Sequence, residues 1–263
     1  MTRPAPYQTD YRDALSLTVP RDRFARSDGR PRRAPSLMRR YEAAALLPDL
    51  TIRHTSVTAP ALPVFEEATA AFARGTLVQT VGGPVAVEDL LPGDYLETTR
   101  GPEPVVWIGS TSFIPNVQST DSGLLALTRI VAEAMGPAKP GNDLVLGPGA
   151  RMVEDCARLK TLIGQSRVLV PVTDQRDGDR ILEIRPAGSV DLYHLALRHH
   201  GTIRVGGLEL ESYHPGTTIK RRLDEETMPL FRKLFPHLEG FDGFGELNLP
   251  RTTREVLDSL GSR

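Results

Sequence analysis

The sequence has a single cysteine and no long apolar run, and these two absences exclude several classes of protein. Cys156 is the only cysteine, so an internal disulfide framework and a zinc site built on several cysteines are excluded. No apolar run reaches the ~20 residues that a transmembrane helix needs, and residues 1–20 lack the apolar core of an ordinary secretory signal. We therefore expect a reduced, cytoplasmic setting without a membrane span, with non-classical export as the open alternative.

The chain also lacks an excess of charge of either sign. Its formal net charge is -1, so no global field draws it to nucleic acid or to a membrane surface. One local exception runs from Arg21 to Arg40, where eight arginines gather. Such a run can bind nucleic acid, an acidic partner or a membrane, but no stacking aromatic residue is interleaved beyond Phe24. We interpret residues 1–35 as a mobile, solvated basic arm and expect no nucleic-acid partner.

Turn-forming residues are abundant, with 23 glycines and 22 prolines, and they favour short strands over long helices. Short helices are expected mainly in the flanks of the chain. Ser36 is placed to cap a helix over residues 37–47, which Pro48 would stop, and a second short helix is expected over residues 65–73. The segment 36–70 is thus predicted to consist of short helices and linker.

From Gly75 onward the pattern changes to short strands separated by turns. Asp177-Gly178 is a strong signal for a two-residue hairpin turn, and turns recur every ~8–12 residues, which indicates a sandwich, barrel or other curled β domain. Residues 124–135 fit either a helix or the end of a strand. The tail, residues 217–263, returns to short helices, because Thr252 and Glu255 form a capping-box pattern. The expected strands are 76–81, 85–87, 105–108, 168–172, 181–184, 191–197, 202–205 and 208–212.

Four motifs follow one another in order within this β region. Residues 71–80 read Ala-Phe-Ala-Arg-Gly-Thr-Leu-Val-Gln-Thr, and residues 87–109 contain Val-Glu-Asp-Leu, Pro-Gly-Asp and a tryptophan. The third motif is residues 143–151 and the fourth is residues 191–212, which ends in Glu-Ser. Together they resemble the bacterial Hint domain, the self-cleaving module of Hedgehog proteins and inteins. The resemblance covers residues 71–216 and implies a mainly β fold, a horseshoe of curled short strands.

The sequence differs from that family at two positions that take part in its self-cleavage reaction. The family nucleophile, normally Cys, falls at Ala71, and the family His of the third motif falls at Ala150. The segment Gly147-Pro148-Gly149-Ala150 also lacks the usual Ser. In a Hint domain the first side chain attacks the preceding carbonyl and converts the peptide bond into an ester or thioester, which needs a heteroatom lone pair. The histidine protonates the departing amide nitrogen, and a methyl group can do neither.

The leading hypothesis is therefore a non-catalytic Hint-like module, either a binding domain or a scaffold. It has no predicted cofactor, an unknown protein or small ligand as partner, and an undetermined oligomeric state. The alternative is self-cleavage or splicing near residue 70 through a substitute nucleophile. Thr69 would attack a different bond, Thr76 is a structural position in the resemblance, and a lone cysteine such as Cys156 is more often a small buried hydrophobe. The enzyme prediction is thus undecided and leans towards no activity.

The late histidines raise a third hypothesis, a metal-dependent hydrolase that uses His194, His200 and His214. A metal site needs convergent ligands, and Gly201 indicates a turn that interrupts the strand, so ordinary hydrogen-bonded histidines are the favoured interpretation. His200 also matches the last family histidine. Arg198 stands where family members often carry Asp, so we predict that this imidazole lacks an orienting carboxylate.

The vacated reaction centre is predicted to remain as an open groove. Compared with the family's Cys and His, Ala71 and Ala150 have fewer side-chain atoms, and glycines lie beside Ala150. An unfilled buried cavity typically lowers the free energy of unfolding by ~1–5 kcal/mol. Glycine has no side chain to refill the space, and exposed backbone N–H groups could bind a carbonyl or a small anion. Ser212, at the end of the fourth motif, is a further vestigial position. The predicted lining consists of Ala71, Thr76, Gly147, Gly149, Ala150 and His200.

Overall fold

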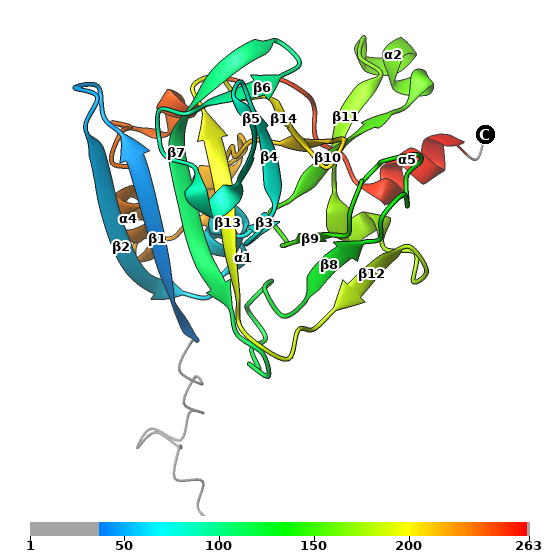
Figure 1. Cartoon of the computed structure of the whole chain (residues 1–263). Coiled ribbons are helices and arrows are strands. Elements are labelled where there is room, and N and C mark those ends of the chain that lie inside the picture. The colour runs from blue at the N-terminus through cyan, green and yellow to red at the C-terminus, as the bar shows by residue number, and fades with distance from the viewer. Residues whose placement is uncertain (1–36, 262–263) are drawn as a thin grey trace, which may run out of the picture. The chain divides into compact units, whose positions relative to one another are not determined.

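The computed structural model describes residues 37–261, and β-strands dominate this range (Figure 1). Within it, fifteen strands are joined by antiparallel pairing, in the order β11-β10-β15-β14-β4-β6-β7-β13-β3-β9-β8-β12, with β1, β2 and β5 attached beside this path. The prediction of a mainly β fold is confirmed. The basic arm expected over residues 1–35 lies outside the described residues.

Most strands are short, and β7 is the longest of them. Their bounds are β1 Met38–Leu46, β2 Ile52–Pro60, β3 Phe72–Ala73, β4 Leu77–Thr80, β5 Gly83–Ala86, β6 Tyr95–Thr98, β7 Gly101–Phe113, β8 Leu127–Ile130, β9 Leu144–Leu146, β10 Arg151–Asp155, β11 Arg167–Pro171, β12 Ile181–Ile184, β13 Val190–Leu197, β14 Thr202–Val205 and β15 Leu208–Glu211. The helices are α1 Pro63–Thr69, α2 Ala157–Ile163, α3 Ile219–Arg222, α4 Thr227–Lys233 and α5 Arg254–Gly261. Three 3-10 turns complete the elements, at Val87–Asp89, Val172–Gln175 and Phe241–Phe244.

The helix predicted over residues 37–47 is wrong, because this segment forms strand β1. Its side chains alternate between exposed and buried, with Tyr41, Ala43 and Ala45 turned into the core. That period of two is the signature of a strand with one buried face. Strand β1 pairs with β2 along its whole length and with β7 on its other side. Pairing on both edges overrides the helix propensity of the alanines.

Other elements follow the sequence more closely. The helix expected over residues 65–73 begins and ends earlier, as α1, because the chain turns at Ala70 to enter β3. The ambiguous segment 124–135 contains strand β8, which pairs with β9 and β12. The two helices expected in the tail are present as α4 and α5.

The long strands β7 and β13 form the centre of the sheet and carry the sole tryptophan. Trp107 is fully buried, and its Nε1 donates a 2.5 Å hydrogen bond to the carbonyl of Leu234 in the tail. Its ring stacks on Phe235, with 4.6 Å between the ring centroids. A Cβ on Gly109 would lie 2.1 Å from the Trp107 ring, so only glycine fits there. The tail and the central strand therefore share one core.

The hydrophobic core has two main parts. One fills the β domain around Phe72, Leu146 and Leu210. The other joins the β1–β2 hairpin to the tail through Tyr41, Phe65 and Phe231. In Figure 1 the hairpin lies beside β7, with α4 behind it. Of the helices in the described range, none is long and apolar enough to cross a membrane.

Candidate functional site

The predicted reaction centre lies where the chain passes from α1 into β3. Ala71 is fully buried at this junction. Its N–H donates a 3.0 Å hydrogen bond to the carbonyl of Tyr193 in β13, and its own carbonyl accepts a 2.9 Å bond from the N–H of Gly147. The carbonyl of Ala70, which a nucleophile at position 71 would attack, accepts a 2.8 Å bond from the N–H of Gly149. The backbone on both sides of the 70–71 bond is thus held by the sheet.

The two glycines of the third motif bring two backbone segments into direct contact. A Cβ on Gly147 would lie 2.3 Å from the carbonyl oxygen of Ala70, and one on Gly149 would lie 2.3 Å from that of Glu67. Real Cβ atoms do not come so close to backbone oxygens. The segments can approach this far only because both positions lack a side chain.

The prediction of an open groove is therefore wrong. Ala71 is 0% exposed and Ala150 is 1% exposed, and both belong to the main core cluster. Beside the two alanines, the backbone at Gly147 and Gly149 lies against that of α1, and Phe72, Leu146 and Met152 belong to the same core cluster. Thr76 is also buried; its N–H donates to the carbonyl of Ala73 in the preceding turn, and its carbonyl accepts the N–H of Val87.

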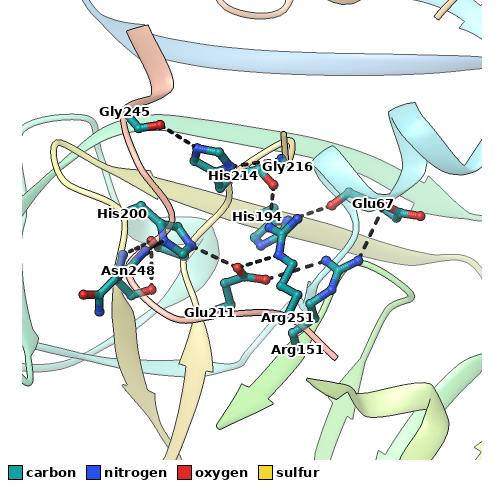
Figure 2. A network of polar contacts seen from close by, with 12 residues as sticks. Glu67, Arg151, His194, His200, Glu211, His214, Gly216, Gly245, Asn248 and Arg251 are labelled. Atoms are coloured by element: carbon teal, nitrogen blue, oxygen red, sulfur yellow. Dashed lines mark hydrogen bonds and ion pairs between the residues drawn. The ribbon is translucent and has the colours of Figure 1, made fainter. Parts of the chain in front are cut away.

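His200 is held in one tautomer, and it does have a carboxylate partner. The N–H of Asn248 donates to its Nδ1 at 2.9 Å, so the ring proton is on Nε2. Nε2 donates to Oε1 of Glu211, also at 2.9 Å (Figure 2). The prediction of a missing partner is wrong because the β14–β15 hairpin places Glu211 opposite Thr202, two residues after His200.

Glu211 is a buried carboxylate surrounded by positive groups. Its side chain is 1% exposed, and Oε1 also accepts a 2.9 Å bond from Nε of Arg251. Nη1 of Arg151 lies 3.6 Å from Oε2. Burial alone raises the pKa of Glu211, but the hydrogen bond from His200 and the charges of Arg251 and Arg151 outweigh it and lower the pKa to about 2. Glu211 is therefore ionised throughout the physiological range.

A second carboxylate extends the network towards Ala70. Nη2 of Arg151 lies 3.8 Å from Oε2 of Glu67, which belongs to α1. Arg222 of α3 donates to both oxygens of Glu67, at 2.9 and 2.8 Å. Positive and negative groups thus alternate from Arg222 through Glu67, Arg151 and Glu211 to Arg251. Figure 2 shows the part of this network from Glu67 to Arg251.

Ser212 has a structural role beside this network. Its hydroxyl accepts a 3.0 Å bond from the N–H of Gly201 and lies 3.1 Å from the carbonyl of the same residue. The backbone N–H of Ser212 also donates to that carbonyl. Ser212 therefore fixes the turn after His200 and has no hydroxyl proton free for chemistry.

The histidines proposed as metal ligands already use most of their ring nitrogens. His214 donates from Nε2 to the carbonyl of Gly245 and accepts the N–H of Gly216 at Nδ1. His194 donates from Nδ1 to the carbonyl of Glu67 at 2.8 Å, and its Nε2 is buried without a partner. Burial lowers the pKa of both His194 and His214 to about 4, so both rings are neutral at pH 7. No group of His, Cys, Asp and Glu within the described range is arranged to hold a metal ion.

Comparison with known proteins identifies the framework around this network. A model of the Hint domain family matches residues 70–217, more than half of the chain. The chain belongs to the Hint-domain family. Among curated proteins none matches.

Solved structures with similarity to this Hint-domain protein share little of its sequence. The bacterial intein-like domain from Clostridium thermocellum is 14% identical; 55% of this chain and 99% of that chain are covered, with a TM-score of 0.37. The gp41-1 intein is 11% identical, with 55% and 99% covered and a TM-score of 0.33. The MchDnaB-1 intein is 14% identical, with 54% and 100% covered and a TM-score of 0.32. The family assignment rests on the family model.

The tail that follows the Hint domain supplies much of the network. Asn248, Arg251 and Gly245 contact His200, Glu211 and His214, and all three lie beyond the matched range. The tail also covers the edge of β11: Leu169 donates to the carbonyl of Pro250 and accepts the N–H of Thr252. Our sequence reasoning missed these partners because nothing in the spacing links a tail arginine to a strand forty residues earlier. In the sequence, Glu211 is indicated only by its place in the Glu-Ser pair that ends the fourth motif.

Proposed function

We propose that this Hint-domain protein does not cut or splice itself and acts as a folded binding or scaffold module. The proposal rests on the side chain of Ala71, which is a fully buried methyl group. The backbone on both sides of the 70–71 peptide bond is held by hydrogen bonds. Acyl transfer to a side chain needs a thiol or hydroxyl at that position. Ala150 likewise offers no proton donor for the departing nitrogen.

The substitute nucleophiles considered from the sequence have other contacts. The Thr69 hydroxyl is buried and donates a 3.0 Å bond to the carbonyl of Phe65 within α1. Cys156 packs with Leu159 and Val168 in a separate small cluster, away from the cluster that contains Ala71. These contacts favour the non-catalytic hypothesis over self-cleavage near residue 70.

His200 is also poorly placed for the later proton transfers of a self-cleaving Hint domain. A general acid or base must exchange a proton with the reacting group, which it has to reach directly or through one water. Both ring nitrogens of His200 are occupied, one by Asn248 and one by Glu211. This arrangement is consistent with a structural role for the histidine.

The proposal is tested by the intact mass of the purified full-length chain. We expect one species of 28.8 kDa, unchanged after incubation with a thiol or with hydroxylamine, which cleave thioesters and esters. A fragment cut before Ala71, or a cut that disappears on Thr69→Val, would support the self-processing alternative instead.

A variant series separates the missing nucleophile from the missing histidine. Ala71→Cys alone should yield little cleavage, because Ala150 still cannot protonate the leaving nitrogen. Cys156→Ser in the same background is the matched control, since it leaves the new thiol as the only one. Efficient cleavage in Ala71→Cys would contradict the view that the rest of the site is inert.

A further inference from the structure

A separate hollow of about 280 Å³ lies where the two flanks of the Hint domain meet its central strands. The turn of the β1–β2 hairpin forms one side, and β7 and β13 form the floor through Val106 and Ala196. Tail residues around Leu238 and Phe244 form the other side. Small-molecule sites are concave and span roughly 300–1,000 Å³, so this hollow suits only a small ligand.

The walls of the hollow are mostly apolar, and one of them carries an unusual backbone conformation. Leu50 ends the hairpin turn with a φ of 65°, in the left-handed region that normally selects glycine or asparagine. Its side chain is 75% exposed and lines the hollow. The three-residue loop of this hairpin needs a left-handed residue at its last position, and leucine is a costly choice there. Strain of this kind clusters at ligand-binding positions.

Two polar groups at the hollow lack partners. Nδ1 of His237 is buried without a hydrogen bond. The guanidinium of Arg198 is exposed at the hollow and has neither an ion-pair nor a hydrogen-bond partner among residues 37–261. Burial lowers the pKa of His237 to about 4, so the ring is neutral at pH 7 and donates from Nδ1 to an occupant when its one proton is on that nitrogen. His200, which also lines the hollow, has both nitrogens satisfied.

These features specify the chemistry of an occupant. Apolar walls require an apolar body, and a buried polar atom without a partner is rare unless a water or ligand satisfies it. A free guanidinium at the same place favours a carboxylate, which it can bind through two parallel hydrogen bonds. We propose that this hollow binds a small apolar carboxylate, of the size of a medium-chain fatty acid, with its head group at Arg198 and His237 and its chain against Leu50 and Phe244.

The sole tryptophan provides a readout on the full chain. Phe244 lines the hollow and packs edge-to-face on Phe235, with 4.9 Å between centroids, and Phe235 stacks on Trp107. Titration with octanoate should change the Trp107 fluorescence and saturate, and calorimetry should give the same dissociation constant. Octan-1-ol should bind at least ten-fold more weakly. Equal affinity for the alcohol would overturn the assignment of a carboxylate.

Variants locate the binding on the structure. Arg198→Ala should weaken octanoate binding at least ten-fold, and Leu50→Asn, which suits the left-handed backbone but removes the apolar wall, at least three-fold. Arg204→Ala is the matched control, because Arg204 is an exposed arginine on β14 that does not line the hollow; it should bind as the parent does. No saturable change, unchanged affinity in Arg198→Ala, or an equal loss in Arg204→Ala would each overturn the proposal. The intact-mass experiment decides the non-catalytic function independently of these results.

Discussion

At the scale of single residues, the predicted reaction centre around Ala71 and Ala150 is buried. The sequence predicts that it is inert, because a methyl group at either position has no lone pair and no proton to give. Its shape could not be predicted. Glycine in a sequence permits either an empty space or a close approach, and only the contacts of Gly147 and Gly149 with the carbonyls of Ala70 and Glu67 decide between them.

Because the backbone at Gly149 lies against the backbone of α1, we expect even a small side chain at position 149 to destabilise the fold. Gly149→Ala should lower the free energy of unfolding by roughly 2–4 kcal/mol, because a Cβ there overlaps the carbonyl oxygen of Glu67 in α1, which also accepts the hydrogen bond from the buried His194. Urea unfolding of the purified chain measures the change. Gly188→Ala is the control, since a Cβ at Gly188 meets nothing within 4 Å. Equal stability of the two variants would show that the segments are not in contact.

At the scale of elements, the β1–β2 hairpin and the C-terminal tail are parts of the same body as the Hint domain. The hairpin extends the central sheet through the pairing of Ala44 with Ile108, and the tail closes over Trp107. Local propensity misled the sequence prediction for β1, because alanine favours helix unless a neighbouring strand edge is available. The carboxylate partner of His200 was missed for a similar reason, since it comes from the next strand across the hairpin.

The charge network makes a prediction at this same scale. Glu211→Gln should lower the free energy of unfolding by about 2–4 kcal/mol, because it leaves Arg151 and Arg251 without their shared, buried counter-charge. Glu209→Gln, two residues earlier on β15, should cost less than about 1 kcal/mol, because the Glu209 side chain is 33% exposed in its pair with Arg167. Thermal unfolding of both variants under the same conditions compares them. A smaller effect at Glu211 than at Glu209 would contradict a linking role for the network.

At the scale of the whole molecule, burial of titratable groups ties stability to pH. His194, His214 and His237 have pKa values lowered by burial from 6.5 to about 4. The unfolded chain therefore binds protons at these three positions before the folded chain does. Their contribution to stability is fully present above pH 6.5 and is lost as the pH falls from 6.5 through 4. Glu211, with its pKa lowered from 4.5 to about 2, adds a further loss below pH 4.5.

We therefore expect the free energy of unfolding to fall on acidification, by roughly 1 kcal/mol per pH unit for each of the three histidines between pH 6.5 and 4.5. Urea unfolding at pH 7.5, 6.5, 5.5 and 4.5 gives the slope. His214→Gln should reduce the slope, whereas His54→Gln, at an exposed position on β2, should leave it unchanged. A flat profile between pH 6.5 and 4.5 would show that these buried rings can be protonated without cost.

The sequence therefore predicts the β character of the molecule and the extent of its Hint domain better than it predicts what lies around them. Turn residues such as Asp177-Gly178 and the order of the four motifs are local signals, and they can be read directly. The partners of His200 and the anchoring of Trp107 depend on contacts between residues distant in the chain. Such contacts produce no repeating pattern of residue types that could be recognised in a single sequence.

Residues 250–252 occupy the outer edge of β11, where Leu169 donates to the carbonyl of Pro250 and accepts the N–H of Thr252. An unpaired strand edge offers free N–H and C=O groups to another chain and is a starting point for aggregation. The tail therefore protects this edge, in addition to supplying Arg251 to Glu211.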